Sequence, residues 1–260
     1  ECHRKAWHLL CHRRELDGFA PALTYGRAIH EGLDVWQKAI MRGSTDRPTI
    51  LTDMEAAAER EFSTVELPED EWRHLGRAKE VLGLYLDERW DEDRSFKILE
   101  SEKYHHKELG HVHVEGLGEI TITWQGKIDG IWSDPRNGAI AVKDSKTSSH
   151  EFEHHGPGGG PGRDAVRYQQ SGQFMGYCFL TGATSALVDS ITCLKPLQRM
   201  TAKSAPRNQF ERIPFEWSPE QISEWQHRTL FQIQQWLEAI MLDTPASLMN
   251  TNACAWPTVC

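Results

Sequence analysis

Apolar residues recur at helical spacing early in the chain. Ile29, Leu33 and Trp36 share one face of a helix predicted at residues 24–42, and Gly43 is placed to end that helix. Similar periodicity predicts five further helices, at residues 2–16, 53–63, 68–90, 164–181 and 218–242.

Polar residues mark the expected starts of three of these helices. Asp53 is the expected N-cap of the helix that begins there, and the acidic residues 69–71 suit the first turn of the next long helix. Ser218 is the expected N-cap of the last helix, with Glu220 and Gln221 in its first turn.

From residue 96 onward the pattern changes to the alternation that is typical of strands. Strands are predicted at residues 96–104, 111–124, 127–133, 138–144, 185–194 and 209–215. Pro135, Asn137 and Gly138 provide a turn between the third and fourth of them, and residues 148–163 form a loop rich in Gly, Pro and His. Helices, antiparallel strands and further helices in this order indicate an α+β (mixed α/β) fold with a central sheet.

The length of 260 residues, with 39% hydrophobic content, suits a single large domain. We expect a helical N-terminal part at 1–95, a core at 96–217 and a C-terminal helix and cysteine tail at 218–260. No run of about 18 apolar residues predicts a membrane span, and no signal-peptide pattern opens the chain. Because the chain does not begin with Met, we expect it to be a piece of a longer protein.

The net charge of −9 argues against a general nucleic-acid coat protein, which is usually basic. It is compatible with a metal site, because such a site needs carboxylates and the metal supplies local positive charge. The six cysteines lie mainly at the two ends of a large chain, which does not resemble a secreted disulfide scaffold. A reducing, intracellular (cytoplasmic) setting is therefore expected.

Two neighbouring predicted strands carry the residues most suited to chemistry. Asp129 lies in the segment Gly-Lys-Ile-Asp-Gly-Ile-Trp, and Asp144 and Lys146 lie in Ala-Ile-Ala-Val-Lys-Asp-Ser-Lys-Thr. Asp144 and Lys146 are two residues apart and point to the same face of a strand. The turn between the strands lets them pair, which brings Asp129 close to Asp144.

Two carboxylates of this kind suit Mg²⁺ or Mn²⁺, which prefer oxygen ligands. A lysine beside them can position an attacking water or offset charge that builds up on a phosphate. The pattern Asp-x-Lys is common by chance, and for the motif alone an ion pair on an edge strand is the favoured explanation. The order Gly-x-Ile-Asp, about 15 residues and then Asp-x-Lys-Thr is much more specific.

With these motifs, the chain resembles the RecB-like branch of the PD-(D/E)XK nucleases, which includes RecB and AddB nuclease domains, CRISPR-associated exonucleases and phage enzymes. Three further segments match the family: Gly-Arg-Ala-Ile-His-Glu at 26–31, Glu102 on the first strand, and Gln-Phe-Met-Gly-Tyr at 173–177. The resemblance covers nearly the whole chain, and the order of the motifs is its most specific part.

The resemblance implies roles for these residues. His30 would be a metal ligand together with Asp129 and Asp144, with the Ser145 carbonyl as an additional ligand, although a lone helical histidine is usually structural. Glu102 would belong to the catalytic group, but alternation leaves Glu100 as a rival. The residues expected to contact DNA from beside the site are Thr147, Gln173 and Tyr177, the last two being four residues apart on a helix, which ordinary packing would also explain.

The end cysteines resemble the iron–sulfur staple of this family. Cys2, Cys254 and Cys260 would bind a 4Fe–4S cluster, with the fourth ligand beyond Cys260 or, less simply, Cys11. A structural Zn²⁺ site and three unrelated thiols are the alternatives. Two further cysteines lie among apolar neighbours and are expected in the core: Cys178 and Cys193.

Two other segments invite a functional interpretation. A basic stretch can grip the DNA backbone, or it can be a solvated loop. Its members are Lys195, Arg199, Lys203, Arg207 and Arg212. His150, His154 and His155 suggest metal binding, but the surrounding Gly and Pro favour a loop near the site.

The resemblance therefore implies a restriction-endonuclease-like core, its sheet flanked by helices and its two ends joined by the cluster. It also implies exonuclease activity on DNA ends, with single-stranded DNA as the first expectation, in a bacterial or phage-encoded protein. Partners would be DNA and a helicase, recombination or CRISPR protein. The alternatives are a non-catalytic DNA-binding module with the same fold and a metal-dependent hydrolase of another phosphoester.

Overall fold

The computed structural model describes residues 21–63, 65–69, 71–150, 152–155, 160–193 and 209–241. Contacts divide the chain into two compact units. The larger unit comprises residues 20–105 and 125–222, and the smaller unit comprises residues 1–19, 106–124 and 223–260. The helix predicted at 2–16 and the cysteine tail lie outside the described residues, so those predictions stay open. Among the helices of the described residues, none has the length and hydrophobicity of a membrane-spanning segment.

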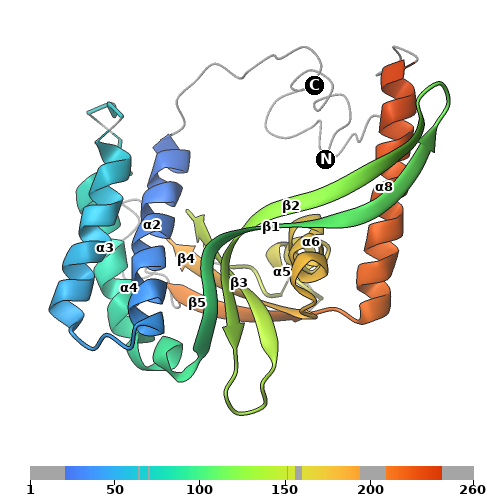
Figure 1. Ribbon diagram of the computed structural model, residues 1–260. Helices are drawn as coiled ribbons and strands as arrows, with labels where there is room; N and C mark the ends of the chain where they lie inside the picture. Colours follow the sequence, from blue (N-terminus) through green and yellow to red (C-terminus); the bar gives the residue numbers. More distant parts are fainter. Residues whose placement is uncertain are drawn as a thin grey trace. The chain divides into compact units, whose positions relative to one another are not determined.

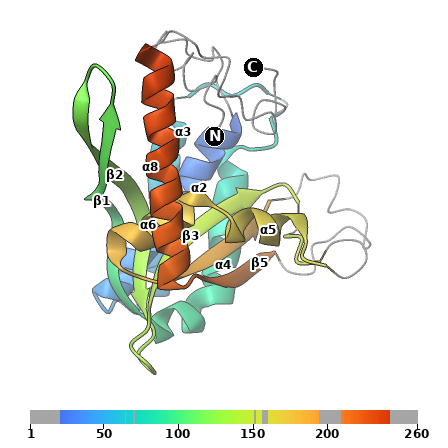
Figure 2. The same ribbon diagram turned by 90° about the vertical axis from the view of Figure 1, so that its right-hand side faces the viewer.

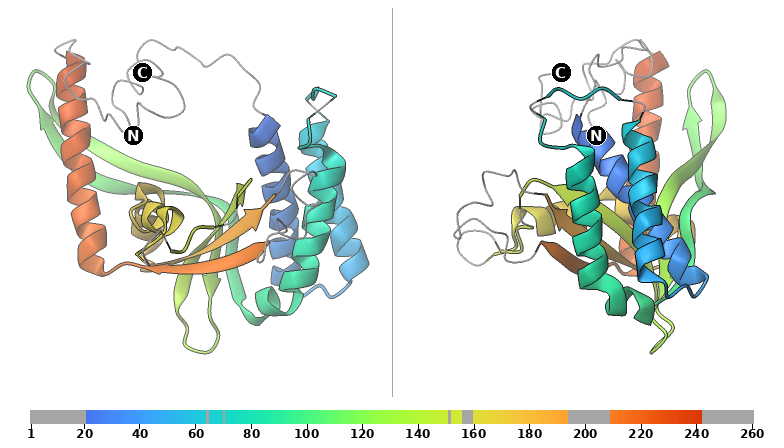
Figure 3. Two further views of the ribbon diagram at one scale, coloured as in Figure 1. Left: turned by 180° about the vertical axis from the view of Figure 1, so that it is seen from behind. Right: turned by 90° about the vertical axis from the view of Figure 1, so that its left-hand side faces the viewer.

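Three helices form one side of the larger unit: α2 (Pro21–Met41), α3 (Arg47–Phe62) and α4 (Leu75–Ser95). They lie side by side, as the blue to teal helices of Figures 1 and 3 show. Their facing apolar side chains, such as Trp36 and Leu82, are almost completely buried. Burial of such side chains removes apolar surface from water and is the main force that holds the three helices together.

The ends of these helices test the capping predictions. α2 ends as predicted, because Gly43 adopts a φ of +69° and its N–H bonds to the Ile40 carbonyl at 2.8 Å. α3 begins at Arg47 rather than at Asp53, because the side chain of Asp46 accepts the Thr49 N–H.

The predicted start of the next helix at residue 68 was also wrong, since α4 begins at Leu75. Its N-cap is His74, whose ring nitrogen Nδ1 accepts the Arg77 N–H at 3.3 Å. Before that point, the carboxylate of Glu71 accepts the backbone N–H of Arg73 at 2.9 Å. Such a local side-chain bond offers the backbone an alternative to the helix.

The central sheet has five strands in the order β1-β2-β3-β4-β5. The strands are β1 (Lys97–Val114), β2 (Gly118–Ser133), β3 (Ile140–Ser148), β4 (Ser185–Thr192) and β5 (Phe210–Glu216). β3 pairs antiparallel with β2 and parallel with β4, and β5 is antiparallel to β4. This mixed sheet with flanking helices confirms the predicted α+β fold.

The connection from β3 to β4 contains two short helices, α5 (Arg163–Gln169) and α6 (Gly172–Thr181), where one helix at 164–181 was predicted. Figure 2 shows both helices beside the sheet. Tyr168 of α5 packs edge-on against Phe215 of β5, with ring centroids 6.1 Å apart. The chain turns between the two helices at Ser171, which has an extended backbone and precedes α6.

The strand predictions identified extended chain but placed several boundaries wrongly. The strand predicted at 111–124 is wrong, because the hairpin turn at residues 115–117, with Gly116 at a φ of +84°, divides it between β1 and β2. The predicted break between residues 104 and 111 is absent, because β1 continues through it, with Gly110 at a φ of +145°. β2 likewise continues through residues 125 and 126. The predicted turn after β2 is confirmed, since Gly138 has a φ of +71° and its N–H bonds to the Asp134 carbonyl at 2.7 Å.

In the smaller unit, the described residues are 106–124 of the β1–β2 hairpin and 223–241 of helix α8 (Pro219–Met241). Trp124 packs edge-on against Trp225, with ring centroids 5.2 Å apart. α8 begins with the predicted cap: the Ser218 hydroxyl accepts the Gln221 N–H, and the Gln221 side chain accepts the Ser218 N–H.

Candidate metal centre

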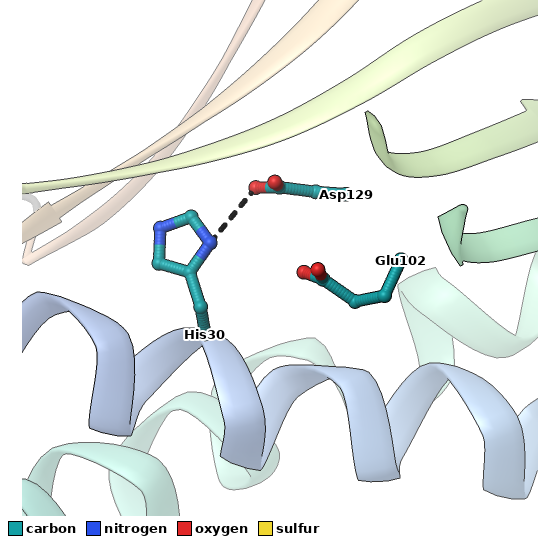
Figure 4. Close-up of side chains that lie close together, drawn as sticks. All are labelled: His30, Glu102 and Asp129. Atoms are coloured by element: carbon teal, nitrogen blue, oxygen red, sulfur yellow. Dashed lines mark ion pairs between the residues drawn. The ribbon is translucent and has the colours of Figure 1, made fainter. Parts of the chain in front are cut away.

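Three side chains from three elements converge in the larger unit. His30 comes from α2, Glu102 from β1 and Asp129 from β2, and one potential ligand atom of each lies within 4.8 Å of the others. Figure 4 shows the ring of His30 and the two carboxylates turned toward one another. The Nδ1 atom of His30 lies 3.1 Å from Oδ2 of Asp129. An imidazole nitrogen and two carboxylates form a donor set that suits Mn²⁺ or Mg²⁺ and also resembles sites for other divalent metals.

The structure distinguishes Glu102 from its rival. Glu100 pairs with Lys103 and with His105, at 2.7 Å in each case, so it belongs to a surface ion-pair group. Glu102 instead pairs with Lys127 and joins the converging group. Its φ of +49° is the only positive value among the described non-glycine residues. This strained backbone breaks the alternation of β1 and directs the carboxylate toward the centre.

Asp129 lies where β2 and β3 part. The paired register runs from Ser133 with Ile140 to Gly130 with Lys143. Beyond this pairing, the Ser145 N–H, two residues after Lys143, donates to the carboxylate of Asp129 at 2.9 Å. Burial would raise the pKa of Asp129, but the hydrogen bond and charge of His30 and the Ser145 N–H outweigh burial and lower that pKa to about 2.

The predicted proximity of Asp129, Asp144 and Lys146 is confirmed. Burial, and secondarily the charge of Asp129, raise the pKa of Asp144 to about 6. Nζ of Lys146 lies 2.7 Å from Oδ2 of Asp144. Burial lowers the pKa of Lys146, but the charge and hydrogen bond of Asp144 overcome that effect and raise it above its ordinary value. Lys146 is therefore a cation at neutral pH.

Asp144 is not part of the group of three whose ligand atoms converge, and whether it binds a metal stays a prediction. The same holds for the Ser145 carbonyl. The charge of Asp144 nevertheless acts on the centre, because it helps to raise the pKa of His30 against the opposing effect of burial. Asp144 and His30 therefore share one electrostatic environment.

Three of the residues expected to contact DNA lie in the described ranges: Thr147, Gln173 and Tyr177. Burial raises the pKa of Tyr177, and the charges of Asp144, Lys146 and Asp129 also act on that pKa, so Tyr177 lies near the centre. Nε2 of Gln173 donates to the hydroxyl of Tyr177 at 2.9 Å. A Cβ atom on Gly126 would lie 2.8 Å from the Tyr177 ring, so Tyr177 packs on the bare backbone of β2 three residues before Asp129. The hydroxyl of Thr147 lies 3.4 Å from the position that a Cβ on Gly26 would occupy. Their role in DNA binding stays a prediction.

Several predicted residues cannot be placed at the site. Cys2, Cys11, Cys254 and Cys260 and the basic residues Lys195, Arg199, Lys203 and Arg207 lie outside the described residues. Cys178 and Cys193 are buried in the core, as predicted. His150 pairs with Asp164 and His154 with Glu211, and neither histidine belongs to the converging group.

The assignment of Arg212 to a DNA-binding surface was wrong. Its side chain is 7% exposed and bonds to Asp189 at 2.7 Å and to Asp93 at 2.8 Å. Lys143 reaches the same Asp189 at 3.2 Å from β3. We call Asp93, Lys143, Asp189 and Arg212 the ionic core. Because these groups are paired and inaccessible, they stabilise the packing of α4 on the sheet and cannot bind a phosphate.

Sequence reasoning missed Lys127. It precedes Asp129 by two residues, so strand alternation places both on one face, and this signal was available. The hydrogen bond from the Ser145 N–H to Asp129 could not be predicted from the sequence, because it depends on where β2 and β3 separate.

Comparisons with known proteins find one kind of likeness. Models of protein families and curated proteins each give no match. A crystal structure from Eubacterium rectale, named a putative exonuclease, aligns with 100% of this chain and 82% of its own chain at a TM-score of 0.51. The two sequences are 12% identical, so the likeness concerns the fold.

Proposed function

We propose that this chain is a metal-dependent DNA nuclease that hydrolyses phosphodiester bonds and acts as an exonuclease on DNA ends. The observation that carries the proposal is the convergence of His30, Glu102 and Asp129, with Asp144 and Lys146 beside them. The similarity in fold to a protein named a putative exonuclease supports it. The resemblance of the motifs to PD-(D/E)XK nucleases supports the finer assignment.

The donor set fits Mg²⁺ or Mn²⁺, with His30, Glu102, Asp129 and Asp144 as the residues that would hold the ion. All four offer nitrogen or carboxylate oxygen, and soft thiolates are absent from the converging group. When bound, such an ion supplies Lewis acidity and lowers the pKa of a bound water.

The protein's own groups would orient the reactants. In the metal-free protein, Asp144 outweighs burial and holds the pKa of Lys146 above its ordinary value, so its ammonium group donates hydrogen bonds. Its ammonium group, held by Asp144, would position the attacking water and offset the negative charge that develops on the phosphate. Asp129 is ionised across the physiological range, because its pKa is about 2, and so it is ready to bind a cation.

An unpaired DNA end fits the surface next to Glu102. Tyr104 follows Glu102 by two residues on β1, and its side chain is 75% exposed. Lys127 forms the ion pair with Glu102, and it is 39% exposed. An aromatic face stacks on a base only when that base is free of its duplex neighbours, and an ammonium group contacts the backbone phosphate. Tyr104 and Lys127 therefore favour a single-stranded substrate.

The proposal has two parts that concern residues outside the described ranges. Cys2, Cys254 and Cys260 would bind a 4Fe–4S cluster, with Zn²⁺ as the rival. Arg199 and Lys203 would contact the DNA backbone. A helicase, recombination or CRISPR protein would be the partner.

The test is digestion of end-labelled linear DNA, single-stranded and duplex, with Mg²⁺, Mn²⁺ or EDTA. We expect metal-dependent release of short products from single-stranded ends and no cutting of a single-stranded circle. Asp134→Asn, which removes an acid from the β2–β3 turn, is the matched control for Asp144→Asn. Binding of DNA without cleavage under every metal would contradict the proposal and would favour the non-catalytic DNA-binding module.

A further inference from the structure

A buried amide joins helix α2 to strand β2 beside the metal centre. Gln37 follows His30 by seven residues, two helical turns, so both point from the same face of α2. The side chain of Gln37 is buried, with 3% of the residue exposed. Its Nε2 donates to the backbone carbonyl of Asp129 at 3.1 Å, and its Oε1 accepts from Nε1 of Trp132 at 2.9 Å.

Gly130 makes this close approach possible. A Cβ atom on Gly130 would lie 2.3 Å from Oε1 of Gln37 and 2.8 Å from Nε1 of Trp132. These separations are far shorter than any non-bonded contact allows, so only glycine permits the amide to reach the strand. A glycine is therefore required after Asp129, because Gln37 of helix α2 packs directly on that position.

The amide acts at the same residue as the metal centre. Asp129 is bonded through its carboxylate to His30 and through its carbonyl to Gln37, and both partners come from α2. The other buried bond nearby on α2 joins Trp36 to Asp93 of α4 at 2.8 Å and does not involve β2. Gln37 is thus placed to hold the backbone of Asp129 at a set separation from the helix that carries His30.

We propose that Gln37 is a positioning residue for the metal centre, which keeps Asp129 and His30 at the separation needed to share one ion. This inference rests on the metal site of the proposed function. Glutamine suits the role because one amide supplies both a donor and an acceptor. An ionised glutamate could still accept from the indole N–H but would place an acceptor against the Asp129 carbonyl. Methionine would form neither hydrogen bond.

The experiment compares Gln37→Met with Trp36→Phe in the full chain. Both variants remove a buried hydrogen bond from adjacent positions on α2, but only the first bond reaches Asp129. Binding of Mn²⁺ is measured without DNA by electron paramagnetic resonance, and the melting temperature is measured on the same samples. Loss of a residue that orients a metal ligand typically weakens metal affinity by about 10–100-fold.

We expect Gln37→Met to weaken Mn²⁺ binding by about tenfold, and Trp36→Phe to lower the melting temperature while leaving Mn²⁺ affinity unchanged. Equal Mn²⁺ affinity in Gln37→Met and wild type would overturn the inference, because a purely structural bond affects stability alone. If Gln37→Met does not fold, Trp132→Phe is measured instead, because it removes the indole N–H that donates to Gln37. We expect this variant to bind Mn²⁺ more weakly than wild type. Unchanged Mn²⁺ affinity would refute the positioning role of Gln37.

The outcomes also separate this inference from the proposed nuclease activity. If wild type binds Mn²⁺ but cuts no DNA, the nuclease proposal fails while the Gln37 comparison still decides the positioning role. If wild type binds no Mn²⁺, the metal centre and the role of Gln37 are both wrong.

Discussion

Asp144 and Asp189 lie on the adjacent parallel strands β3 and β4, one register step apart, and both are almost completely buried. Their pKa values nevertheless move in opposite directions. Burial raises the pKa of Asp144 to about 6, whereas burial at Asp189 is outweighed by Lys143 and Arg212, which lower its pKa. Equal burial therefore does not determine the state of an acid.

The difference lies in the number of donors around each carboxylate. Asp189 is contacted by Arg212, by Lys143 and by the Tyr85 hydroxyl. Asp144 has one close cation, Lys146, and faces the like charge of Asp129. A carboxylate surrounded by donors stabilises the fold, whereas one that lacks donors beside another acid is suited to bind a cation.

The largest expected effect is the loss of activity in Asp144→Asn. If Asp144 serves the metal centre directly, the rate of cleavage should fall by more than about 100-fold, while the protein stays folded. That loss exceeds what is typical when a residue that only orients a metal ligand is removed. Digestion of single-stranded DNA in Mn²⁺ measures the loss, and circular dichroism checks the fold. Near-normal cleavage by this variant would remove the distinction between the two aspartates.

The matched change in the ionic core is Asp189→Asn, which should destabilise the protein instead. Lys143 would lose its ion-pair partner, and Arg212 would lose one acidic partner while keeping Asp93 and Glu92. Removing one partner of a buried ion pair costs about 3–5 kcal/mol. Urea unfolding of metal-free protein measures the change in the free energy of unfolding. Arg136→Met, which breaks an exposed pair with Asp134, is the control and should leave stability near wild type. A stable Asp189→Asn variant would contradict the structural role.

A smaller and more selective effect is expected for Lys146→Met. Because Lys146 is a protonated donor rather than a metal ligand, the variant should lose about 10²–10³-fold in kcat and retain its affinity for Mn²⁺. Steady-state cleavage and Mn²⁺ titration of the same samples measure both quantities. A fall in metal affinity as large as the fall in kcat would show that Lys146 acts by holding Asp144 in place.

The smallest effect concerns pH and the stability of the metal-free protein. The pKa of Asp144 is about 6 in the folded state against an ordinary 3.8, so its ionisation destabilises the fold as pH rises from about 4 to 6. Asn at this position should therefore be more stable than wild type at pH 7, with the advantage disappearing near pH 4. The opposite shift at Asp189 predicts that the penalty of Asp189→Asn shrinks as pH falls below about 4.

Urea unfolding in EDTA between about pH 2 and 8 measures these pH dependences, with the part above pH 4 reporting on Asp144 and the part below it on Asp189. Parallel pH profiles for wild type and Asp144→Asn would contradict the raised pKa of Asp144. They would also weaken the contrast with Asp189.

Local patterns predicted much of the fold and of the site. Helical spacing identified α2, and the Ser218–Gln221 pair identified the start of α8. Alternation and a turn at Gly138 predicted Asp129 beside Asp144, and the charge of Asp129 does act on the pKa of Asp144. These predictions succeeded because each depends on residues that are neighbours in sequence and whose backbone preferences agree.

The wrong boundaries arose where a nearby residue offered an alternative that spacing does not reveal. The Asp46 side chain accepts the Thr49 N–H, so α3 begins before the predicted cap. The Glu71 carboxylate accepts the Arg73 N–H, so the chain before α4 is not helical. The predicted gap between residues 104 and 111 contains Gly110. A Cβ there would lie 2.8 Å from a methyl carbon of Leu230, so this glycine permits close packing within a continuous strand.

The sequence by itself determined which residue types lie on which strand and helix, because those follow from local periodicity and capping. Only the tertiary structure decided between Glu102 and Glu100, since a strained φ at one residue redirects the carboxylate. It also showed that Arg212 pairs with buried acids instead of facing solvent. Likewise, it showed that Gln37 donates to the backbone carbonyl of Asp129. Each of these outcomes depends on partners tens of residues away, and packing sets such distances, which no local pattern encodes.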